Sequence, residues 1–147
     1  MFLKLSRGVW FISILGVLAA LLFVYASMQT DSVILSQEQS ARYTISREAF
    51  FYTVLIVVTA INALVFVIGA VFRRDEAFRT WFNGLMMTLN LFFIISLFFI
   101  NALNSLEKFD FARIGFLIYG SVALISLWAL AWPVVSAFKK FLPKQPV

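Results

Sequence analysis

Long apolar stretches that contain no charged side chain divide this chain and determine its architecture. They run over residues 8–30, 49–72, 80–106 and 114–138. Each stretch exceeds the ~20 residues that cross a ~30 Å hydrocarbon core as an α-helix. None shows the alternation of a barrel strand, so only a helix satisfies its backbone polar groups in lipid. The sequence predicts an all-α membrane protein with spans at approximately 8–29, 49–72, 80–102 and 112–135.

Composition supports this prediction and limits what else the chain can contain. Hydrophobic residues make up 63% of the 147 residues and charged residues 13%, with a mean hydropathy of +0.96. Water-soluble domains carry about a quarter charged residues. Because the spans use most of the chain, we expect residues 1–147 to form one four-helix transmembrane domain. No room is left for a separate soluble catalytic module.

The basic residues predict the orientation of the four spans. Positive charges gather in the cytoplasmic loops of membrane proteins. With the amino terminus inside, eight of the twelve Lys and Arg residues lie on the cytoplasmic side: Lys4, Arg7, Arg73, Arg74, Arg79, Lys139, Lys140 and Lys144. Four remain outside, so the count favours an antiparallel bundle with both termini in the cytoplasm. The same basic residues are scattered at span ends and form no continuous patch, which argues against a nucleic-acid partner.

The first span has a second interpretation as a secretory signal peptide. Lys4 and Arg7 would form its basic region, and Val24–Tyr25–Ala26 offers small residues near a cleavage position. The apolar run is longer than the ~7–15 residues of a signal peptide, which favours an uncleaved anchor. Both interpretations remain open at this point.

The polar segment at residues 30–48 predicts an outer loop with room for a short hairpin. It can contact something outside the membrane or merely connect two spans. Ser46 is placed to cap the second span, Asp75 the third and Asp110 the fourth, because short polar side chains accept from free backbone N–H groups at helix starts. Pro133 is expected to end or bend the fourth helix near the inner surface.

Asparagine is the polar residue that this chain places inside its spans. On the third span Asn83, Asn90, Asn101 and Asn104 share one helical face, which must meet protein or water. Asn62 lies ten residues before Phe72 and Asn90 ten residues after Thr80. At 1.5 Å per residue both lie at a depth of ~15 Å. We predict that Asn62 and Asn90 hydrogen-bond to each other; the alternative is that each faces another subunit.

Small residues follow one face of the first span: Ser13, Gly16, Ala20 and Ser27. Small side chains allow close approach of helices in membranes. We interpret this face as a packing surface, with dimerisation as the alternative.

Several chemistries are disfavoured because their residues are missing. The sequence has no histidine and no cysteine, so the commonest metal and haem ligands are absent and so is thiol chemistry. The four stretches also lack the ionisable groups of ion-coupled transporters and proton relays. We therefore predict that the chain has no catalytic, cofactor-binding or metal-binding residues and that it is not an enzyme.

The run from Arg79-Thr80-Trp81-Phe82-Asn83 through Phe92-Phe93-Ile94 to Glu107-Lys108-Phe109-Asp110 resembles short, uncharacterised four-span inner-membrane proteins of Gram-negative bacteria. The resemblance implies a location in a bacterial inner (cytoplasmic) membrane. It implies no activity and carries over no functional residues.

These observations lead to two hypotheses about function. The first is a small, non-catalytic accessory or scaffold subunit, partnered by the lipid bilayer and by other membrane subunits through the polar face of the third span. The second is a small pore, or a carrier for a neutral or lipidic solute, lined by the four asparagines of that span.

Overall fold

Four long helices and one short hairpin make up the described part of the protein. The computed structural model describes residues 2–37, 42–105 and 111–141. In chain order its elements are α1 (Phe2–Ser27), β1 (Ser32–Gln37), β2 (Arg42–Ser46), α2 (Arg47–Val71), α3 (Glu76–Asn104) and α4 (Phe111–Phe141). All four of these helices are long and apolar enough to cross a membrane. The prediction of four membrane-spanning helices is confirmed in this sense.

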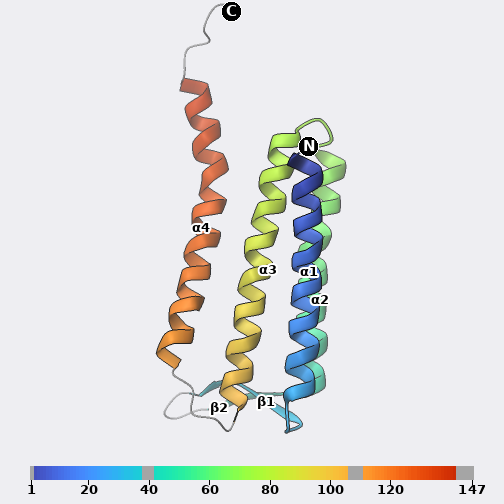
Figure 1. Cartoon of the computed structure of the whole chain (residues 1–147), viewed down its shortest axis with the longest axis vertical. Coiled ribbons are helices and arrows are strands. Elements are labelled where there is room, and N and C mark those ends of the chain that lie inside the picture. The colour runs from blue at the N-terminus through green and yellow to red at the C-terminus, as the bar shows by residue number, and fades with distance from the viewer. Residues whose placement is uncertain (1, 38–41, 106–110, 142–147) are drawn as a thin grey trace, which may run out of the picture.

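The helices pack together with alternating directions along the chain (Figure 1). The N-terminus and the α2–α3 turn lie at one end, called here the N-terminal end. The β1–β2 hairpin lies at the opposite end, called the hairpin end. α1 and α3 therefore run parallel, and they share the largest interface between helices. α4 packs against α3 alone among the described elements, and its last turns extend beyond the other helices.

The apolar core lies between α1, α2 and α3. The helices contribute Val17, Leu21 and Val24 of α1, Val58 of α2 and Leu97 of α3 to it, all almost fully buried. A second cluster, nearer the N-terminal end, joins one residue from each helix: Trp10, Val65 and Met86. α4 adds only Ser121 to the buried set in the described part of the chain. α1, α2 and α3 therefore form one compact unit, and α4 packs on its surface through α3.

Two of the predicted helix caps are present. The Ser46 hydroxyl accepts a hydrogen bond from the backbone N–H of Ala49 at 3.2 Å, and Asp75 accepts from Phe78 at 2.8 Å. These bonds satisfy donors that the first turn of a helix leaves without a backbone partner. Both predictions are confirmed, whereas Asp110 lies outside the described residues.

The short hairpin considered from the sequence is also present between α1 and α2. β1 and β2 pair antiparallel, with an irregularity between Ile34 and Ser36. Val33 has no exposed surface and packs in the core with Met28 and Phe50. The hairpin thus covers the end of the three-helix core.

α4 continues through Pro133 to Phe141, well past the position where the sequence led us to expect an end or a bend. Proline removes one backbone hydrogen bond from a helix. Membrane helices tolerate it because small local adjustments satisfy the freed carbonyl.

Candidate interhelical polar site

Asn62 of α2 and Asn90 of α3 form a reciprocal amide pair in the middle of the bundle. Asn62 Nδ2 donates to Asn90 Oδ1 at 2.9 Å, and Asn90 Nδ2 donates to Asn62 Oδ1 at 3.0 Å. Asn90 has no exposed surface and Asn62 is 5% exposed. The sequence predicts this pair because the two residues lie at equal depth in neighbouring spans. The structure confirms the prediction.

α1 completes this pair from the third side. The indole Nε1 of Trp10 donates to Asn62 Oδ1 at 2.9 Å, and Asn90 Nδ2 donates to Ser13 Oγ at 2.9 Å. Asn62 Nδ2 also donates to the carbonyl of Val58, one turn earlier on α2. Every N–H of the two amides thus has an acceptor. A fully satisfied network avoids the cost of a buried polar group without a partner.

The pair belongs to a longer ladder between the parallel helices α1 and α3. Serines of α1 meet asparagines of α3 at three levels: Ser6 with Asn83 at 3.0 Å, Ser13 with Asn90 at 2.9 Å and Ser27 with Asn101 at 2.6 Å. At the level between, the two helices contribute Ala20 and Leu97, which are both buried in the same core cluster. These three asparagines of α3 therefore find partners within the same chain.

The spacing of the ladder explains why it can continue along both helices. Ser6, Ser13, Ala20 and Ser27 follow one another at intervals of seven residues, as do Asn83, Asn90 and Leu97, whereas the last rung uses Asn101, four residues after Leu97. A seven-residue repeat keeps one face of each helix in contact as the two helices wind around each other. Close approach is needed, and a Cβ at Gly16 would lie only 3.3 Å from Cδ1 of Ile94. The small-residue face of α1 is therefore a packing surface toward α3.

Asn104 joins the end of α3 to the hairpin instead of to α1. Its Oδ1 accepts from the backbone N–H of Ile34 at 2.8 Å, and its Nδ2 donates to the carbonyl of Ile34 at 3.0 Å. The side-chain amide thus pairs with both backbone groups of one residue of β1, as a neighbouring strand would. It covers part of a strand edge that would otherwise present free backbone groups.

The arrangement holds helices together and offers little for catalysis. The asparagine amides are neutral, and those of Asn62 and Asn90 already use all their donors. In the described residues no group of three or more Asp, Glu, His or Cys side chains is placed to hold a metal ion. Interhelical hydrogen bonds of this kind contribute on the order of 0.6–2 kcal/mol each in a bilayer.

Sequence reasoning missed the α1 side of this site. Ser6 and Trp10 were not singled out as partners, and Ser13 was considered only as a small residue. The missed signal is the seven-residue spacing of Ser6 and Ser13 in α1, which matches that of Asn83 and Asn90 in α3.

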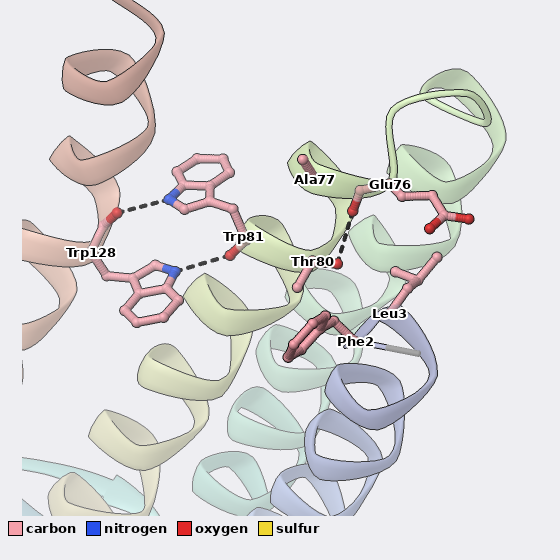
Figure 2. Close-up of a pocket in the computed structure, with 7 residues that line it drawn as sticks. All are labelled: Phe2, Leu3, Glu76, Ala77, Thr80, Trp81 and Trp128. Carbon is pink, nitrogen blue, oxygen red and sulfur yellow. Dashed lines mark hydrogen bonds between the residues drawn. The ribbon is translucent and has the colours of Figure 1, made fainter. Parts of the chain in front are cut away.

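A second polar contact attaches α4 to α3 near the N-terminal end. Trp81 Nε1 donates to the carbonyl of Trp128 at 2.8 Å, and Trp128 Nε1 donates to the carbonyl of Trp81 at 2.9 Å. Figure 2 shows the two indoles reaching across to each other's backbone. Gly84 makes room for this contact, because a Cβ there would lie 2.3 Å from Cζ2 of Trp128. We call these three residues the indole latch.

Beside the latch, the first turns of α1 and α3 border a cavity of about 470 Å³ together with α4. It is lined by Phe2, Leu3, Glu76, Ala77, Thr80, Trp81 and Trp128 (Figure 2). The Thr80 hydroxyl donates to the Glu76 carbonyl within the same helix. The cavity lies beside α4, which contacts only α3 among the described elements.

Five of the predicted cytoplasmic anchors lie at the N-terminal end. Lys4 and Arg7 lie in the first turns of α1, whereas Arg73, Arg74 and Arg79 surround the α2–α3 turn. Arg79 Nη1 donates to the carbonyl of Arg73 at 3.3 Å and tightens this turn. Lys139 and Lys140 lie in the last turn of α4, where only the backbone is described, and Lys144 lies outside the described residues.

Searches against models of protein families, curated proteins and solved structures find no match for this chain. No family is identified for it, so what it does must be argued from its own residues.

Proposed function

We propose that this protein is a small, non-catalytic subunit of a membrane complex, in which α1, α2 and α3 form a self-contained core and α4 binds a helix of another membrane protein. The observation that carries the proposal is the sparse packing of α4. Only α3 contacts it among the described elements. Phe116, Tyr119 and Leu127 are 76%, 78% and 70% exposed.

Small residues on α4 support the same assignment. A Cβ added at Gly115 or Gly120 would meet nothing within 4 Å. Helices associate in membranes by close backbone approach at small residues, because burial of apolar surface gives no gain over lipid. α4 therefore presents small positions that the rest of this chain leaves free.

The polar face of α3, on which the sequence-based hypothesis placed the partner subunits, is occupied within the chain. Asn83, Asn90, Asn101 and Asn104 each bond to α1 or to the hairpin. We therefore place the partner surface on α4. The same bonds argue against the alternative of a pore or carrier, because a lining of asparagines must turn its amides to water or solute.

We further propose a bacterial inner membrane, with the N-terminal end of the bundle in the cytoplasm. The gathering of Lys4, Arg7, Arg73, Arg74 and Arg79 at that end supports this orientation. Reporter domains fused to either terminus should both be active in the cytoplasm. A reporter active only outside at one terminus would contradict the orientation.

Site-specific photocross-linking in native membranes tests the proposed partner surface. A photoreactive residue at Tyr119 or Leu127 of α4 should give a discrete cross-linked product with another protein. Ile12 of α1 and Ile56 of α2 are matched controls, at 66% and 67% exposed. Equal cross-linking from all four positions, or none from α4, would reject the assignment.

A further inference from the structure

A groove runs between α1 and α2 from the N-terminal end toward the middle of the bundle. It consists of two adjoining cavities of about 260 and 210 Å³, and Trp10 and Phe66 line both. The two rings meet edge to face with their centroids 5.7 Å apart. Arg7, Val65 and Gly69 line the outer part. Ile14, Leu18, Val58, Thr59, Asn62 and Ala63 line the inner part.

The mouth of the groove is basic. Arg7 is exposed there and has no hydrogen-bond or ion-pair partner among the described residues. A second guanidinium is close, because Nη2 of Arg79 lies 3.8 Å from the position of a Cβ at Gly69. Neither nearby carboxylate lines the groove: Asp75 caps α3, and Glu76 borders the cavity beside α4. The mouth therefore suits an anionic group.

The inner part of the groove suits an apolar chain. Asn62 contributes to its wall, but both amide N–H groups of Asn62 are already bonded and its oxygen accepts twice. It has no donor to offer a ligand, which leaves Thr59 as the remaining polar side chain of the inner wall. From Arg7 to Leu18 the groove follows α1 for ~16 Å at 1.5 Å per residue. One leaflet of a ~30 Å hydrocarbon core is ~15 Å deep.

We propose that this groove binds one anionic phospholipid, with the phosphate on the Arg7 guanidinium and an acyl chain along Trp10 and Phe66 toward the middle of the membrane. The lipid comes from the leaflet at the N-terminal end. It would seal the gap between α1 and α2 beside the buried Trp10–Asn62 hydrogen bond. This site does not depend on the partner surface proposed for α4.

Native mass spectrometry of the full-length protein in mild detergent tests the site. Phosphatidylglycerol and phosphatidylcholine with identical acyl chains are added separately, and free glycerol phosphate is added as a competitor that carries the charge without the chain. Arg7→Gln removes the charge at the mouth, and Arg74→Gln is its control at the same end. Ala63→Trp fills the inner part, with Ala123→Trp on exposed α4 as its control. Gly69→Leu fills the outer part and raises helix propensity, so it should keep the fold.

We expect the wild type to bind phosphatidylglycerol about fivefold more tightly than phosphatidylcholine, the effect of about one basic residue at a membrane surface. Arg7→Gln should remove this preference, whereas Arg74→Gln should keep it. Ala63→Trp and Gly69→Leu should weaken the binding of both lipids, and Ala123→Trp should not. Equal binding of the two lipids by the wild type would overturn the proposal. So would binding that both groove-filling variants leave intact, or displacement of the lipid by glycerol phosphate.

Discussion

Asn90 of α3 and Ser13 of α1 meet across two parallel helices, with Asn90 Nδ2 donating to Ser13 Oγ at 2.9 Å. Ser6 and Asn83 meet at the same separation along the chain, one repeat nearer the N-terminal end. Because both contacts join residues 77 apart in the chain, α1 and α3 pack in the same register at both levels. In a bilayer, where apolar side chains match lipid almost as well as they match each other, such polar contacts specify which helices pair and in which register.

Replacing Asn90 should expose how much the network stabilises the bundle. Asn90→Leu leaves Asn62 and Ser13 each without one buried partner, which should cost about 1–3 kcal/mol of unfolding free energy. Reversible unfolding in mixed detergent micelles measures this. Asn62→Leu combined with Asn90→Leu should cost less than the sum of the two single changes, because the reciprocal bonds are lost only once. Strict additivity would show that the two amides do not interact.

Trp10 should stabilise the folded bundle through the hydrogen bond of its indole N–H as well as through the packing of its ring. Trp10→Phe keeps an aromatic ring against Phe66 but removes the donor to Asn62, so we expect a loss of about 0.5–1.5 kcal/mol in the same unfolding experiment. Trp132→Phe is the matched control, since the indole of Trp132 makes ring contacts on the α3–α4 side and no hydrogen bond in the described part of the chain. Equal effects of the two changes would contradict the role of the hydrogen bond.

Asn104 should hold the hairpin against the end of α3. Asn104→Leu removes the acceptor for the Ile34 N–H, so the exchange of that amide hydrogen should accelerate by about tenfold, the equivalent of ~1.4 kcal/mol. Hydrogen exchange read out by mass spectrometry of hairpin peptides measures it. Asn83→Leu, at the other end of α3, should leave this exchange unchanged. Protection of Ile34 that survives Asn104→Leu would show that the hairpin is held by its core contacts alone.

Gly84 should determine whether α4 can close on α3. Gly84→Ala places a methyl group where Trp128 now packs, so the indole latch should open and the distance between the helices should increase and spread. Electron paramagnetic resonance between spin labels at Ala77 of α3 and Ala131 of α4 measures this distance and its distribution. Gly115→Ala is the control, because its added Cβ meets nothing within 4 Å. An unchanged distance distribution in Gly84→Ala would show that α4 is held by other contacts.

The sequence predicts the elements of this fold well because each leaves a local signal. Uninterrupted apolar stretches mark the four helices, and Ser46 and Asp75 mark two of their starts. The pairing of Asn62 with Asn90 also follows from local information, since a short turn fixes the relative depth of α2 and α3.

The remaining contacts depend on which faces of the helices pack against each other. The residues that make these contacts are far apart in the sequence, so local sequence patterns do not predict their pairing. Ser6 and Asn83 are 77 residues apart, and Trp81 and Trp128 are 47 apart. Apolar stretches do not reveal the rotation of a helix, because lipid-facing and core-facing positions are equally hydrophobic. The polar residues carry this information instead, because the equal spacing of Ser6 and Ser13 and of Asn83 and Asn90 indicates α1 as the partner of α3.

Disulfide formation between Ala20→Cys and Leu97→Cys in native membranes tests whether α1 of the same molecule binds the polar face of α3. Both residues are buried at the apolar level of the ladder, and the chain has no cysteine of its own. We expect a rapid disulfide within one chain, and none between Ala20→Cys and Leu91→Cys, since Leu91 is 43% exposed on another face of α3. Disulfides that form only between two chains, or equally with both partners, would contradict this expectation.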